Sequence, residues 1–137
     1  MSRTLLLGFA VLFGVAQEAN GIFMLVSPMD WYQAVPGVTS TGPFNQHFVR
    51  DIGLVFMFMG GAFVIGAIRP RWRVPLWAAA TLWLAGHALF HFWEVAAGIN
   101  SSSVLLRDFP DVTLPALIGI LLTAWAFLAG SNAATDG

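Results

Sequence analysis

The chain has 137 residues, of which 58% are hydrophobic and only 9% are charged. A soluble domain carries roughly 25% charged residues, so this composition excludes an ordinary soluble globular protein. The formal net charge is -1, from six basic and seven acidic residues, which argues against a nucleic-acid partner. There is no cysteine, which excludes disulfides, thiolate metal sites and thiol nucleophiles.

Four apolar stretches are each close to the ~20 residues that an α-helix needs to cross a bilayer. The first two stop before Pro28 and Pro70, and the last stops at Gly130. Pro75 and Pro115 suit the first turns of the third and fourth helices. The sequence therefore predicts an all-α membrane protein, a single transmembrane domain over residues 1–137 with a four-helix bundle at residues 4–26, 47–68, 75–97 and 112–129.

The first stretch has a second interpretation. Its apolar start, followed by the small residues Gly14, Val15 and Ala16, is also typical of a cleaved signal peptide. Apolar sequence resumes at residues 21–26, and cleavage would leave that segment stranded. We therefore expect the first stretch to be retained as a membrane-spanning helix.

The arginines predict the orientation of the bundle. Arg3 precedes the first helix, and three more arginines fill the segment between the second and third helices. In a four-span chain these two segments lie on the same side, and the positive-inside rule makes that side the cytoplasm. Both termini are then cytoplasmic. The outer loops hold one arginine and three carboxylates, Arg107, Asp30, Asp108 and Asp111.

The longer outer loop, residues 27–46, separates the first and second helices. Its proline and glycine pairs, Pro36-Gly37 and Gly42-Pro43, predict turns rather than a strand or a helix. Asn45 is a candidate N-cap for the second helix. The loop should therefore lie over the outer end of the bundle.

The ionisable residues of the predicted helices gather in the outer half of the membrane. His87, His91 and Glu94 have the spacing i, i+4 and i+7, so they share one face of the third helix. The second helix presents His47 and Asp51 at i and i+4, and Glu18 lies in a polar patch of the first helix. Carboxylates are costly in contact with lipid, so we expect these faces to point into the bundle.

Imidazole and carboxylate without thiolate suit a transition metal such as Zn, Fe, Mn or Cu. The predicted ligands are His87, His91, Glu94, Asp51 and Glu18. Such a site would serve redox or hydrolytic chemistry, with Arg50 holding a polar substrate or forming an ion pair. The order His91-x-x-Glu94 reverses the Glu-x-x-His spacing of di-metal helical bundles, so no catalytic residue and no enzyme class are assigned.

Three alternatives remain open. The polar cluster could be a structural network in a non-enzymatic accessory subunit that docks on a larger membrane complex or forms a homo-oligomer. Haem b needs two imidazoles at similar depth, for which His47 and His91 are the pair. A proton pathway is disfavoured because the inner half of the bundle is apolar. Besides the lipid bilayer, a quinone or another small lipophilic substrate could be a partner.

One region resembles a known group of proteins. Residues 31–38, which read WYQAVPGV, and residues 41–53, which read TGPFNQHFVRDIG, resemble a motif of small bacterial four-helix membrane proteins. In size and layout the chain is similar to the DoxX-like group. This resemblance implies a four-helix fold, a bacterial inner-membrane location and a link to quinone-coupled redox chemistry. No catalytic residue of that group maps onto this sequence.

Overall fold

The computed structural model describes the backbone of residues 2–135 and the side chains of residues 2–130. Every regular element within these residues is helical. The long helices are α1 (Arg3–Val26), α3 (Gln46–Ile68), α4 (Pro70–Ala96) and α6 (Leu114–Thr135). Short segments join them: α2 (Pro28–Ala34), the 3-10 turn η1 (Val38–Ser40), α5 (Ser103–Arg107) and the π-helical turn η2 (Phe109–Thr113).

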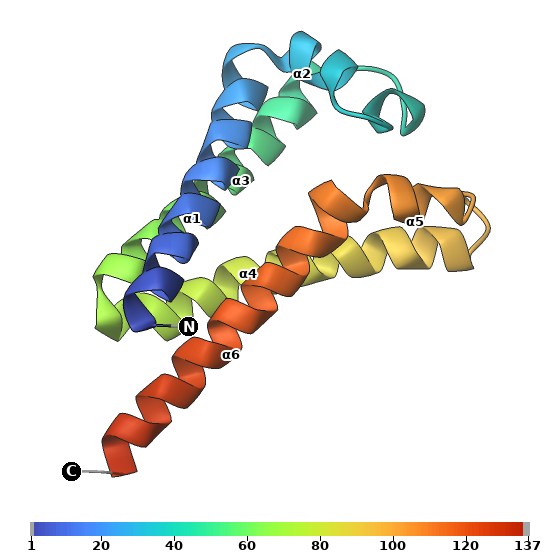
Figure 1. Ribbon diagram of the computed structural model, residues 1–137. Coiled ribbons are helices and arrows are strands. Elements are labelled where there is room, and N and C mark those ends of the chain that lie inside the picture. Colours follow the sequence, from blue (N-terminus) through green and yellow to red (C-terminus); the bar gives the residue numbers. More distant parts are fainter. Residues whose placement is uncertain (1, 136–137) are drawn as a thin grey trace.

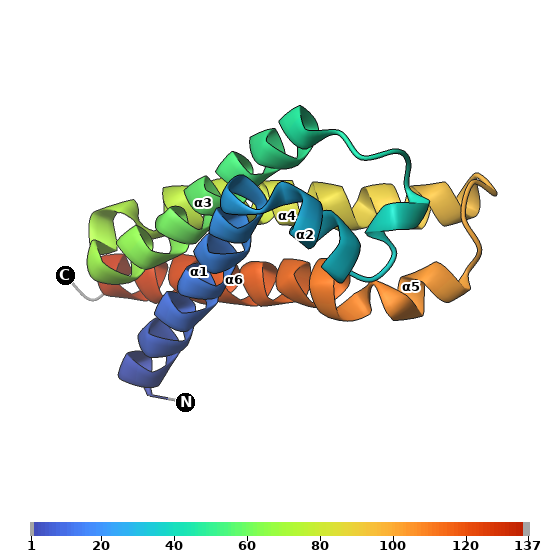
Figure 2. The ribbon, with the colours of Figure 1, turned by 90° about the horizontal axis from the view of Figure 1, so that it is seen from above.

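The long helices form two pairs. Helix α1 packs along α3, and α4 packs along α6, while α3 and α4 meet near the turn that connects them (Figure 1). The start of α1 and the end of α6 lie toward the same end of the molecule as the α3–α4 turn (Figures 1 and 2). We call this the turn end, and the opposite end, where α2 and α5 lie, the roof end. The pairs diverge toward the roof end.

Three helical segments in the described part of the chain are long and apolar enough to cross a membrane, namely Arg3–Val26, Gln46–Ile68 and Phe109–Gly130. Helix α4 is not among them because arginines at its start and His87, His91 and Glu94 near its end lower its hydropathy. The prediction of an all-helical membrane protein is therefore confirmed in its coarse form.

Glycines bring α1 and α3 into close backbone contact. A Cβ atom on Gly21 would lie 2.6 Å from the carbonyl oxygen of Gly53, and one on Gly14 would lie 2.7 Å from that of Gly60. Small residues of this kind let two helices pack without intervening side chains, which is the usual basis of helix association in membranes.

The core at the turn end joins all four long helices. Phe13 of α1 meets Phe63 of α3 edge-to-face, with ring centroids 4.9 Å apart. Phe63 also contacts Trp77 of α4, whose ring lies 6.3 Å from that of Trp125 in α6. This aromatic cluster holds the two helix pairs together, because Phe63 and Trp77 are fully buried.

Three predicted segments differ from the structure. Helix α6 continues to Thr135 instead of ending at Gly130. Helix α4 begins at Pro70 rather than at Pro75, because a proline with its fixed φ is favoured at the first helical position and the chain turns at Arg69. Residues 27–46 contain α2 and η1 rather than turns alone. Pro28 at the start of α2 explains that helix, since it follows the end of α1 directly.

Candidate functional site: a cavity at the roof end

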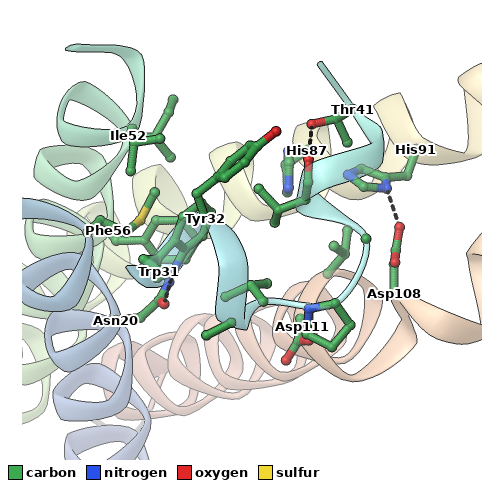
Figure 3. A pocket seen from close by; sticks show the side chains of 18 of the residues that line it. Asn20, Trp31, Tyr32, Thr41, Ile52, Phe56, His87, His91, Asp108 and Asp111 are labelled. Atoms are coloured by element: carbon green, nitrogen blue, oxygen red, sulfur yellow. Dashed lines mark hydrogen bonds and ion pairs between the residues drawn. The ribbon is translucent and has the colours of Figure 1, made fainter. Parts of the chain in front are cut away.

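A cavity of about 960 Å³ lies at the roof end between the two helix pairs (Figure 3). Its walls come from α1, α3, α4 and the segment from Arg107 to Pro115, and α2 and η1 cover it. The volume is at the upper end of the range of roughly 300–1,000 Å³ that small-molecule sites have. The cavity is therefore large enough for a ligand of moderate size.

Aromatic side chains make up much of the lining. They come from three elements: Trp31 and Tyr32 of α2, Phe48 and Phe56 of α3, and Trp83 and Phe90 of α4. In Figure 3, Tyr32 lies between Ile52 and Phe56 of α3 on one side and His87 of α4 on the other. An apolar lining with a few converging polar groups is typical of sites for small organic ligands.

The polar wall is built on α4 and on the segment after α5. His87 stacks on Trp83, with ring centroids 5.1 Å apart, and lies edge-on to His91 at 4.8 Å. The Nδ1 atom of His91 lies 3.2 Å from Oδ2 of Asp108 (Figure 3). The α4 spacing thus places both imidazoles in the cavity, and the chain returning from α5 supplies the carboxylate.

Arg107 neutralises this carboxylate. Its Nε donates to Oδ1 of Asp108 at 2.6 Å, and its Nη2 donates to Oδ2 at 3.1 Å. These hydrogen bonds raise the pKa of the Arg107 guanidinium above its ordinary value. The pair Arg107–Asp108 therefore contributes no net charge to the polar wall of the cavity.

The Nδ1 atom of His91 is buried, yet the described residues offer it no partner with hydrogen-bond geometry. Asp108 is within ion-pair distance, but distance alone does not make a hydrogen bond. Buried polar atoms in native proteins are nearly always hydrogen-bonded. The charged group that the described residues place beside this atom is the Asp108 carboxylate.

The cover of the cavity is tied to α1 and to the short helix α5. The indole Nε1 of Trp31 donates to Oδ1 of Asn20 in α1 at 2.9 Å (Figure 3). On the other side, the Arg107 guanidinium packs directly on Gly37, and a Cβ atom at Gly37 would overlap it. Gly37 has φ +86°, a conformation that favours glycine. Arg107 thus contacts both the cover and Asp108.

The structure brings only part of the predicted metal site together. His87 and His91 line the cavity side by side, whereas Glu18, Asp51 and Glu94 do not line it. Within the described residues, no group of three or more His, Cys, Asp or Glu side chains is placed to hold a metal ion. The five predicted ligands do not lie together in this structure. The metal site that they would form stays a prediction.

Four of the other predicted residues have local partners. Glu18 packs on Gly60 and Gly61 of α3. His47 and Asp51 face each other at 3.2 Å on the surface, with side chains 89% and 56% exposed, so His47 does not meet His91 as a haem pair would require. The Nε of Arg50 donates to the carbonyl oxygen of Leu25 at 3.1 Å.

Two residues of the polar wall, Arg107 and Asp108, were not predicted as site residues. The sequence places them next to each other in an outer loop, where an Arg-Asp pair is typical of an exposed salt bridge. Asp108 is instead only 9% exposed, because η2 turns the chain back over α4. The spacing of residues along one helix cannot predict that a later segment of the chain packs against it.

Comparison of the chain with models of protein families, with curated proteins and with solved structures finds no match. The resemblance to DoxX-like proteins stays a prediction, and function has to be inferred from the cavity itself.

Proposed function

We propose that the chain crosses the bilayer four times, with α4 as the fourth span and both termini in the cytoplasm. Helix α4 is 27 residues long, and its Thr81 hydroxyl lies 2.9 Å from that of Thr123 in α6. Its Leu82 and Leu89 are 76% and 67% exposed, as lipid-facing side chains would be. Four arginines lie at or near the turn end, which supports a cytoplasmic turn end.

The function that the geometry supports best is binding of a small, uncharged, lipophilic molecule with a ring hydroxyl group. The observation that carries this proposal is an aromatic cavity with one polar wall, where His91 is held next to a carboxylate that Arg107 already neutralises. A phenol or a quinol would satisfy both the apolar lining and the polar wall. An anionic ligand is disfavoured because the Arg107 guanidinium is already occupied by Asp108.

The carboxylate selects how His91 would contact such a molecule. A carboxylate next to Nδ1 favours the tautomer with the proton on that nitrogen. The other ring nitrogen, Nε2, is then a hydrogen-bond acceptor. A ligand hydroxyl can donate to it. His91 would be the binding residue and Asp108 its positioning residue.

Replacing His91 with leucine should weaken binding of a decyl-tailed bromophenol by about tenfold or more, the cost of one hydrogen bond to the ligand. Bromine quenches tryptophan fluorescence at contact, and Trp31 and Trp83 line the cavity. The measurement is saturable quenching in lipid nanodiscs. His47→Leu is the matched control, because His47 is an exposed histidine outside the cavity. Equal affinities in the two variants would contradict the proposed site.

A bound transition metal is the second candidate, favoured by the adjacent imidazoles of His87 and His91 and the unpartnered Nδ1 atom. Two histidines at i and i+4 can bind one ion from a single helix face. We then expect elemental analysis of protein purified without chelator to find stoichiometric metal, lost in the double variant His87→Ala/His91→Ala. Metal that persists in that variant, or a wild-type protein that binds none when Zn²⁺ is supplied, would reject this candidate.

A further inference from the structure

The floor of the cavity is a contact between α3 and α4. Phe56 and Trp83 meet edge-to-face, with ring centroids 5.7 Å apart. From the turn between them to the roof end, the two helices run apart (Figures 1 and 2). Between this contact and the roof end, α3 and α4 are separated, and the cavity lies in the space between them.

The edges of the cavity on α3 and α4 are open. Phe48 of α3 and Phe90 of α4 both line the cavity, yet they are 62% and 50% exposed. On α1, the lining residues Gln17 and Met24 are buried, whereas Ala16 is exposed. Between α3 and α4, the cavity has an opening that is edged by apolar side chains.

Beside Phe48, the polar side chains of His47 and Asp51 are exposed. Toward the turn end, the exposed side chains next to the opening are apolar, namely Leu54 and Phe58 on α3 and Leu82 and Leu89 on α4. Helix α3 is long and apolar enough to span a membrane, so these side chains would contact lipid. An opening edged by Phe48 and Phe90 would then face the hydrocarbon of the bilayer rather than water.

We propose that the gap between α3 and α4, edged by Phe48 and Phe90, is a lateral portal for a single-tailed amphiphile from the bilayer. The amphiphile places its uncharged ring at His91 and leaves its hydrocarbon tail in the lipid between the two helices. This inference rests on the proposed function, to which it adds the class of ligand and the route of entry. An apolar opening that faces lipid would admit a molecule dissolved in the bilayer more readily than one dissolved in water.

Photolabelling tests the position of the tail directly. The probe is a phenol with a decyl tail that carries a diazirine, added to the full chain in nanodiscs, and the labelled residues are mapped by mass spectrometry. We expect saturable labelling of α3 around Phe48 and of α4 around Phe90, removed by an excess of the same phenol without the diazirine. His91→Leu should raise the probe concentration for half-maximal labelling by about tenfold or more, and His47→Leu should leave it unchanged.

The outcomes separate the portal from the site. Saturable labelling that depends on His91 but falls on α1 or α6 would overturn the portal and keep the site. The absence of any saturable labelling would overturn both. Labelling at Phe58, an exposed residue on the same helix outside the cavity, reports probe dissolved in lipid and should not saturate.

Discussion

Replacing Arg73 with glutamine is expected to destabilise the folded protein by about 3 kcal/mol or more, because it removes two charge-assisted hydrogen bonds of roughly 1.5–3 kcal/mol each and two cation–π contacts. Arg73 is only 7% exposed. Its Nε donates to the carbonyl oxygen of Gly66 at 2.9 Å, and its Nη2 donates to that of Ala67 at 3.0 Å. The last carbonyls of a helix have no partner within the helix, so Arg73 caps the end of α3.

The guanidinium of Arg73 also lies against the core at the turn end, 5.7 Å from the Trp77 ring centroid and 5.8 Å from that of Trp125. Loss of the side chain would leave two carbonyls without a partner and loosen the contact between the helix pairs. Thermal unfolding in detergent, followed by tryptophan fluorescence, measures the effect.

Arg71 provides the matched control for Arg73. It lies on the same turn of α4, is exposed, and stacks on Trp72 with its guanidinium carbon 5.4 Å from the ring centroid. Arg71→Gln should change the free energy of unfolding by less than about 1 kcal/mol, since exposed cation–π contacts contribute little. Equal destabilisation by the two substitutions would show that total charge near the turn, and not the cap on α3, is what matters.

The buried position of Arg73 could not be predicted from the sequence. In the sequence it is one of three closely spaced arginines, and the positive-inside rule treats all of them alike. The rule predicts a side of the membrane from the number of charges. It does not distinguish an arginine that faces water from one that lies against two indole rings, because that difference depends on where α3 ends and how α6 packs.

The helix ends were predictable where one residue decides them. Pro28 and Pro70 follow α1 and α3 closely, and both helices end before them. The N-cap prediction for α3 is confirmed, because the Asn45 side chain accepts a hydrogen bond from the backbone N–H of Phe48 at 3.1 Å. The start of α4 was missed because Pro70 and Pro75 both suit a first turn, and local sequence does not decide between them.

The site was predictable only along single helices. The spacing of His87 and His91 correctly placed both imidazoles on one face of α4. His47 and Asp51 also share one face of α3, but the prediction that this face points into the bundle was wrong, because both side chains are exposed. Which helix faces which residue depends on the tertiary packing. Glu18 has a depth similar to that of His87, but the glycines of α3 draw α1 close, and Glu18 packs on Gly60 instead of lining the cavity.

Substitutions at those glycines should give the second large effect on stability. The comparison is between Gly60→Ala and Gly61→Ala. A Cβ atom at Gly60 would lie 2.5 Å from the carbonyl oxygen of Gly14 and 2.8 Å from the amide nitrogen of Glu18. Both are backbone atoms of α1, so the whole helix has to move. Overpacking of this kind costs about 1 to 3 kcal/mol, and we expect Gly60→Ala to lower the midpoint of thermal unfolding accordingly.

Gly61 is the adjacent residue on the same helix, but its surroundings differ from those of Gly60. A Cβ atom at Gly61 would meet only Oε1 of Glu18, at 3.4 Å, at the end of a flexible side chain. Alanine also favours the helix over glycine by up to about 1 kcal/mol, so Gly61→Ala should be neutral or slightly stabilising.

The pair of glycine variants decides between two physical explanations. If helix propensity governed stability, both alanines would stabilise α3 equally. If the close approach of α1 governs it, the two variants should differ in sign, with Gly60→Ala alone destabilising. Because α1 supplies Gln17, Asn20 and Met24 to the cavity, displacement of α1 by Gly60→Ala should also weaken binding of the bromophenol probe, which Gly61→Ala should leave intact.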